Sequence, residues 1–189
     1  PLEKRELLPF AILGEHAADG AFHADNVAPS LLGGMILTRD IRLLDVHRVF
    51  VPNGLDVSVV IPKTPVLTKE ARGILSKTVP LNDMIAQSAN LAALIHAMHV
   101  GDFGLIARSL QDRVIEPQRA SMQHRFYDVQ RAALNAGAMG CGISGSGPTI
   151  FAISANDNIA NAVVKSIEAI YESDKIESRA WVSTINNQG

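Results

Sequence analysis

The stretch CGISGSGPTIFAI, residues 141–153, says most about the fold of this 189-residue chain. Cys141–Ile143 can form a short strand, Ser144–Pro148 must form a loop, and Thr149–Ile153 has the composition of a second strand. Three glycines within six residues let the loop backbone approach a ligand closely, and successive N–H groups can form an anion-binding nest. A tight hairpin is the alternative, but one or two glycines would suffice for it. The candidate binding residues here are Gly142, Ser144, Gly145, Ser146 and Gly147.

The elements around this hairpin predict an α+β domain. Asp56–Ile61 is a β-branched run closed by Pro62, which is typical of a buried strand, and Arg179–Thr184 predicts a closing strand. Between the hairpin and that last strand, Asn156 or Asp157 can cap a helix. This order favours helices that cover one face of a mainly antiparallel sheet.

The remaining elements follow from hydrophobic periodicity. Asn82–Met98 is a clear helix in which Met84, Ile85 and Leu91 fall on one apolar face. Two strands are expected near the start of the chain, at Gly34–Thr38 and Ile41–Leu44. The other predicted helices are Glu3–Gly14, Thr68–Ser76, Phe103–Val114 and Met122–Asn135.

Composition excludes several classes of protein. The chain has 17 basic and 19 acidic residues, so its net charge of −2 gives no electrostatic footprint for nucleic acid or an anionic membrane. A single cysteine, Cys141, rules out a disulfide framework within the chain. No apolar run approaches the roughly 18 residues of a membrane span, and no signal peptide is recognisable. We therefore expect a soluble, cytoplasmic protein with no nucleic-acid or membrane partner.

A short polar stretch, His23-Ala24-Asp25-Asn26, lies just before the first predicted strand and offers three side chains for ligand contacts. The alternative is a loop in which Asp25 or Asn26 caps the next helix by accepting from backbone N–H groups. The sequence alone does not separate the two interpretations.

Three charged residues complete the set of candidates. Glu15 could hold Mg²⁺, which prefers one or two carboxylates together with water and phosphate oxygens, although a solvated glutamate at a helix end is the simpler interpretation. Arg72 and Arg119 could each grip a carboxylate or phosphate with a guanidinium fork. Most arginines are surface charges, so neither is informative by itself.

Taken in order, four stretches of the chain resemble the GHMP small-molecule kinases, and among them the homoserine kinases. The resemblance runs from about Gly14 to Ser154. Its carriers are HADNVAPSLLGG (residues 23–34), TKEAR (68–72), EPQR (116–119) and GISGSGPT (142–149).

The resemblance implies a ferredoxin-like GHMP kinase C-terminal domain over residues 46–189, preceded by a remnant of the N-terminal domain at 1–45. It also implies transfer of the γ-phosphoryl group of ATP to the hydroxyl of L-homoserine, on the route to threonine, by an enzyme that could be a homodimer. Such a transfer depends more on positioning the reactants and neutralising the phosphate charge than on covalent catalysis.

The same resemblance assigns roles to individual residues. Glu15 would be the Mg²⁺ ligand and, with Asn26, part of the catalytic set. The substrate residues would be His23, Asp25, Thr68, Arg72, Arg119 and Gly145, with both arginines on the homoserine carboxylate. The loop residues Gly142, Ser144, Gly145, Ser146 and Gly147 would support the phosphate region. We expect His23, Arg72, Arg119 and Gly145 to share one hollow.

One feature of the family has no counterpart in these 189 residues, namely the glycine- and serine-rich nucleotide loop that opens a helix. Because this loop is missing, we expect the chain to be either a C-terminal piece of a longer enzyme or a derivative that lost its N-terminal domain. We therefore expect the chain alone to bind ATP poorly. Two alternatives stay open: another GHMP kinase that acts on a sugar or mevalonate, and a non-catalytic ferredoxin-like module that binds an amino acid.

Overall fold

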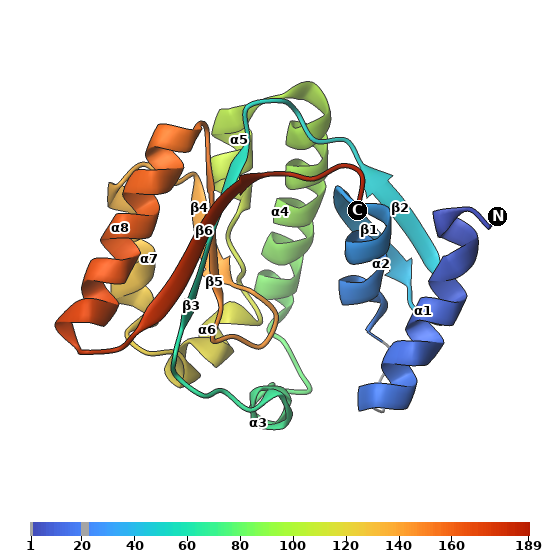
Figure 1. Cartoon of the computed structure of the whole chain (residues 1–189), viewed down its shortest axis with the longest axis horizontal. Helices are drawn as coiled ribbons and strands as arrows, with labels where there is room; N and C mark the ends of the chain where they lie inside the picture. Colours follow the sequence, from blue (N-terminus) through green and yellow to red (C-terminus); the bar gives the residue numbers. More distant parts are fainter. Residues whose placement is uncertain (1, 20–22) are drawn as a thin grey trace. The chain divides into compact units, whose positions relative to one another are not determined.

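The computed structural model describes residues 2–19 and 23–189, which form two compact units (Figure 1). The smaller unit extends to Pro52 and includes Ile185–Gly189, and the larger unit is Asn53–Thr184. Within the described residues, no helix is both long enough and apolar enough to span a membrane.

The smaller unit consists of two helices and a hairpin. Its elements are α1 (Lys4–Asp19), α2 (Ala24–Leu32), β1 (Met35–Asp40) and β2 (Asp45–Val49). The strands pair antiparallel, and the core is formed by Leu8, Ile12, Ala24, Ala28 and Val46. The end of the chain joins this unit, since Gly34 N donates to the Asn186 carbonyl at 2.7 Å. The two buried alanines of α2 let this helix lie close to α1, so that the few elements of the unit enclose a core.

The predicted strand at Ile41–Leu44 is wrong, because those residues form the turn of the hairpin. Asp40 Oδ1 accepts from the backbone N–H groups of Arg42 and Leu43 at 2.8 and 3.0 Å, which is an Asx-type turn that ends β1. Leu44 adopts a positive φ of 51°, which no strand residue has. The second strand therefore begins only at Asp45.

The larger unit contains a four-stranded sheet in the order β4-β5-β3-β6, with all three pairs antiparallel. Its strands are β3 (Asp56–Pro62), β4 (Gly140–Ile143), β5 (Ile150–Ser154) and β6 (Ser178–Thr184). The chain passes through helices between β3 and β4 and through one helix between β5 and β6. This β-α-β-β-α-β order, with the first strand beside the last, is the ferredoxin-like arrangement. The fold class is thus confirmed.

Helices lie on both sides of that sheet, so the expectation of a single covered face is wrong (Figure 1). On one side, α7 (Phe126–Asn135) and α8 (Asp157–Ser173) enclose the main core with Val60, Ile150 and Ala152. On the other side lie α4 (Leu81–Val100) and α5 (Phe103–Ser109), which pack against each other. The remaining short helices are α3 (Thr68–Gly73), α6 (Glu116–Arg119) and η1 (Ala120–Met122).

The helix predicted at Asn82–Met98 is confirmed as α4, but its apolar face is buried only in part: Met98 is 1% exposed, whereas Met84 and Ile85 are 51 and 56% exposed. Two other helices differ in length from the prediction. The helix expected at Phe103–Val114 ends at Ser109. The helix expected at Met122–Asn135 begins at Phe126, because Arg125 takes a left-handed conformation with φ 48°. By contrast, the predicted cap of α8 is confirmed, since Asn156 Oδ1 accepts from Ile159 N at 2.9 Å.

An ion-pair network ties the end of α8 to the start of α7. His124 Nε2 and Arg125 Nη1 lie 2.7 and 3.1 Å from Asp174 Oδ2, and Arg125 Nε also binds Asp128 at 2.9 Å. The hydrogen bond from His124, followed by that from Arg125, lowers the pKa of the Asp174 carboxyl below 3.8. Its contribution to stability is therefore present above pH 3.8 and is lost as the pH falls through the lower folded-state pKa.

We accordingly expect Asp174→Asn to lower the melting temperature at pH 7, and the difference from the parent chain to shrink as the pH falls below 3.8 and to disappear below the lowered folded-state pKa of Asp174. Thermal melts followed by circular dichroism across this pH range would measure it. Glu172→Gln is the matched control, because it removes the same charge from the exposed end of α8. A difference that stays constant in acid would show that the charge of Asp174 is not what stabilises the chain.

Candidate functional site

The glycine-rich stretch forms the loop between the neighbouring strands β4 and β5, as predicted. Ser144 N donates to the Thr149 carbonyl at 2.8 Å, and Gly147 N donates to the Ser144 carbonyl at 3.0 Å, which closes the turn. Gly145 and Gly147 have φ values of 59° and 80°, a region that favours glycine. These contacts define the conformation of residues 144–149, called the glycine loop below.

Arg119 lies at the end of the single turn α6 and joins two segments that are distant in sequence. Its Nη1 donates to the Gly145 carbonyl at 2.7 Å, and its Nε donates to the Ala71 carbonyl at 3.3 Å. A guanidinium has five N–H donors, more than these two bonds use. Arg119 is thus held by the glycine loop on one side and by α3 on the other, with donors to spare for an anion.

Helix α3 brings one further candidate, Thr68, to the same place and carries a second, Arg72. Thr68 Oγ1 lies 3.4 Å from Ser146 Oγ, so the first residue of α3 touches the glycine loop. Arg72 is exposed four residues later, on the same face of the helix as Thr68 because residues at i and i+4 are neighbours. The structure therefore gathers Thr68, Arg119, Gly145 and Ser146.

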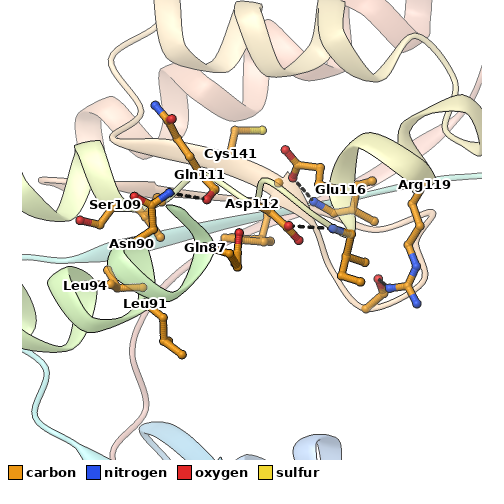
Figure 2. A pocket seen from close by; sticks show the side chains of 16 residues that line it. Gln87, Asn90, Leu91, Leu94, Ser109, Gln111, Asp112, Glu116, Arg119 and Cys141 are labelled. Atoms are coloured by element: carbon orange, nitrogen blue, oxygen red, sulfur yellow. Dashed lines mark hydrogen bonds between the residues drawn. The ribbon is translucent and has the colours of Figure 1, made fainter. Parts of the chain in front are cut away.

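Arg119, Gly142 and Gly145 are among the residues that line a cavity of about 380 Å³. In Figure 2, Arg119 stands at one end of the lining and Asn90 and Leu94 stand at the other. This volume is within the range of small-molecule sites. Three of the residues predicted from the sequence therefore line a hollow of suitable size.

Polar side chains of α4 hold the segment that forms the rim of this cavity. Asn90 Nδ2 donates to the Gln111 carbonyl at 3.0 Å (Figure 2). Gln87 Oε1 accepts from Arg113 N at 2.7 Å. Asp112 Oδ1 accepts from the N–H groups of Val114 and Ile115 at 2.7 and 2.8 Å. The rim is thus ordered by hydrogen bonds that the sequence analysis did not foresee.

Two residues near the glycine loop were missed altogether. Glu116 Oε2 accepts from Ile143 N at 3.3 Å, and its Oε1 accepts from Gln130 Nε2 at 3.0 Å. Burial raises the pKa of this carboxyl above 4.5, and the hydrogen bonds from Gln130 and Ile143 oppose the shift only in part. Gln123, only 7% exposed, donates from Nε2 to the Ser146 carbonyl at 3.2 Å. Neither residue was a candidate, although Glu116 belongs to the EPQR stretch (116–119) that carries the resemblance and Gln123 lies four residues after Arg119.

The remaining candidates belong to the smaller unit. His23 precedes α2 as its N-cap residue, and Asp25 and Asn26 are exposed in the first turn of that helix. The loop expected around Asp25 is therefore wrong: Ala24 and Ala28 are fully buried one turn apart, which favours a helix through this stretch. Glu15 is half-buried in α1. That these residues share a hollow with Arg72, Arg119 and Gly145 stays a prediction.

A magnesium site is compatible with the residues present. Among the described residues, no three histidine, cysteine or acidic side chains cluster as they would in a protein-only metal cage. Mg²⁺ bound with a nucleotide needs only one or two carboxylates, because phosphate and water oxygens supply the other ligands. The single carboxylate of Glu15 fits that requirement.

Comparison with known proteins shows which proteins this chain is similar to. A model of the family described as GHMP kinases C terminal matches residues 91–173. The homoserine kinases of Chlorobaculum tepidum and of Chlorobium phaeobacteroides strain BS1 are 42% and 40% identical over 191 aligned residues, which cover 100% of this chain. The crystal structure of homoserine kinase from Cytophaga hutchinsonii superposes with a TM-score of 0.97 at 44% identity, again over 100% of the chain. The chain is thus similar over its whole length to homoserine kinases, and residues 91–173 match the C-terminal domain of the GHMP kinases.

The chain spans only about 60% of the length of the curated relatives it matches, and it corresponds to their C-terminal portion. A structure of L. major mevalonate kinase also superposes, with a TM-score of 0.75 over 97% of the chain. At 16% identity, that similarity concerns the fold alone. The resemblance inferred from the four sequence stretches is therefore confirmed.

Proposed function

We propose that this chain is the C-terminal portion of an enzyme that transfers the γ-phosphoryl group of ATP to the side-chain hydroxyl of L-homoserine, in threonine biosynthesis. The observation that carries the proposal is the position of Arg119, which lines the cavity and bonds to Ala71 and to Gly145 of the glycine loop, the loop that Thr68 also contacts through Ser146. The names of relatives at about 40% identity support the choice of substrate.

In this proposal, Arg119 and Arg72 bind the homoserine carboxylate, and Thr68 stands beside it. The hydroxyl oxygen of homoserine forms a bond to the γ-phosphorus, the bond from that phosphorus to the β,γ-bridging oxygen breaks, and the hydroxyl proton is released with ADP. Orienting the two reactants is the main demand of such a transfer. The guanidinium groups meet that demand because they fix the planar carboxylate of the acceptor.

The residues of the smaller unit complete the proposed site. His23, Asp25 and Asn26 would contact the acceptor and the transferred phosphate, and Glu15 would hold Mg²⁺ together with phosphate oxygens. The metal would neutralise charge on the phosphates when bound. We also propose that residues 1–45 are part of an N-terminal domain and that residues 46–189 form the C-terminal domain.

The acceptor is tested by a coupled ADP-release assay on the longer protein that contains this sequence, with homoserine, mevalonate and galactose as acceptors. We expect turnover with homoserine to exceed that with the other two. Preference for mevalonate or a sugar would place the protein elsewhere in the family. Homoserine binding without phosphorylation would support the amino-acid-binding module, since the cavity and Arg119 both lie in the larger unit.

We expect this chain by itself to bind MgATP at least about tenfold more weakly than the longer protein, a loss of about 1.4 kcal/mol. The reason is that no glycine-rich loop opening a helix, the usual cradle for phosphates, occurs among these 189 residues. Isothermal titration calorimetry of both proteins measures the difference. Equal affinities would show that the nucleotide site lies within this chain.

A further inference from the structure

One short segment, residues 116–123, contacts the region of the glycine loop at three points. Glu116 Oε2 accepts from Ile143 N at 3.3 Å, just before the loop. Arg119 Nη1 donates to the Gly145 carbonyl at 2.7 Å, and Gln123 Nε2 donates to the Ser146 carbonyl at 3.2 Å. We call residues 116–123 the clasp segment. The loop and the arginine are therefore parts of one hydrogen-bonded assembly.

Two of the motif's glycines make room for this assembly. A Cβ at Gly142 would lie 2.7 Å from Glu116 Oε2, and a Cβ at Gly147 would lie 2.4 Å from Gln123 Oε1. Real Cβ atoms do not approach other atoms so closely. By contrast, a Cβ at Gly145 would meet open space, so that glycine serves the backbone conformation. The space beside Gly142 and Gly147 is thus occupied by the side chains of Glu116 and Gln123. From the sequence alone, these glycines were interpreted as room for the close approach of a ligand.

The environment of Glu116 disfavours its charge. It is half-buried against Gln130 and β4, Gln130 Nε2 also donates to the Cys141 carbonyl at 2.8 Å, and Asp112 adds a like charge nearby. Burial accordingly raises the pKa of Glu116 and makes the ionised form a cost to folding at neutral pH. Retaining a carboxylate there is hard to explain by stability alone.

We propose that Glu116 and Gln123 are positioning residues for the acceptor site: they fix the glycine loop so that the Gly145 carbonyl holds the Arg119 guanidinium in its binding orientation. The inference rests on the proposed function and deepens it. Neither side chain needs to touch the acceptor. Each acts through Arg119, because a shift of the loop would move the carbonyl that the guanidinium is bonded to.

The variants Glu116→Gln and Gln123→Ala test this in the longer protein. A glutamine at 116 can accept from Ile143 N only if its NH₂ faces the donor of Gln130, so at least one hydrogen bond of the assembly is lost. We expect each variant to raise the KM for homoserine about tenfold, the usual cost of one such bond, with little change in kcat. We also expect Glu116→Gln to melt no lower than the parent at neutral pH, since it removes a buried charge.

Gln118→Ala is the matched control within the clasp segment. Gln118 bonds away from the loop, accepting from Ser76 N at 2.7 Å and donating to the Val114 carbonyl. It should lower the melting temperature and leave the KM for homoserine unchanged. If the KM rises in all three variants in step with lost stability, the clasp residues are merely structural and the proposal is overturned.

The decisive measurement combines Glu116→Gln with Arg119→Ala. If Glu116 acts through Arg119, its effect on KM should almost vanish once the guanidinium is gone, because the two losses are not additive. A full tenfold effect in the Arg119→Ala background would refute the positioning role. Failure of the proposed function is distinguishable, since it would appear in the unmodified protein as absence of homoserine phosphorylation.

Discussion

Replacing Arg119 with alanine in the longer protein is expected to raise the KM for homoserine about a hundredfold, or ~3 kcal/mol of lost binding. The guanidinium is held in the lining of the cavity by hydrogen bonds to the Gly145 and Ala71 carbonyls. In the proposed site, its removal would leave the acceptor carboxylate with one arginine in place of two. Initial rates at saturating ATP, with homoserine varied over a wide range, measure the effect.

Two further variants make this result specific. Arg131→Ala removes the same charge from α7, where the side chain is 68% exposed and pairs with Asp128, so the KM should not change. Arg119→Lys should recover only part of the affinity, because an ammonium lacks the planar fork that can bond two carbonyls and a carboxylate at once. An unchanged KM in Arg119→Ala would remove Arg119 from the substrate site.

The largest effect on stability is expected for Phe126→Ala, which should lower the free energy of unfolding by about 3–5 kcal/mol. Phe126 is 2% exposed and belongs to the core between the sheet and the helices α7 and α8. Truncating it removes buried apolar surface and leaves a cavity that its neighbours can fill only in part. Urea denaturation of the chain, followed by circular dichroism, gives the difference.

The adjacent residue supplies the control. Tyr127 is 58% exposed, and its ring packs edge-on against Phe126 at a centroid distance of 5.4 Å. Tyr127→Ala should cost no more than about 1.5 kcal/mol, because it loses one aromatic contact and little burial. Equal losses in the two variants would contradict the packing of α7 described above.

The sequence was sufficient for elements whose signal is local. The β-branched run at β3, the strand-loop-strand of β4 and β5, and the Asn156 cap of α8 all depend on residues close together in the chain, and all were predicted. The turn at Ile41–Leu44 was missed because its apolar residues outweighed the Asp40 side chain that forms the turn. For α4, periodicity identified the helix but gave no information on what covers its apolar face.

For the site, the motifs predicted that Thr68 and Arg119 lie near the glycine loop. In the structure, Thr68 contacts Ser146 and Arg119 bonds to the Gly145 carbonyl. Gln123 lies outside these motifs, and Glu116, although part of EPQR, received no role. A glutamate and a glutamine near a helical turn are usually solvated, and only the fold shows that both are turned toward a loop more than twenty residues further along the chain. The partners of such buried polar groups are set by tertiary structure.

The pairing of β4 with β5 constrains how the sequence between them can vary in length. Cys141 lies opposite Ala152 and Gly142 lies opposite Phe151, in a register with no offset. An insertion or deletion of a single residue that slipped this pairing would turn alternate side chains of the strand to the opposite face. Phe151 would then point into the packed interior and Ala152 away from it. We conclude that the length of this hairpin is constrained as well as the positions of its glycines.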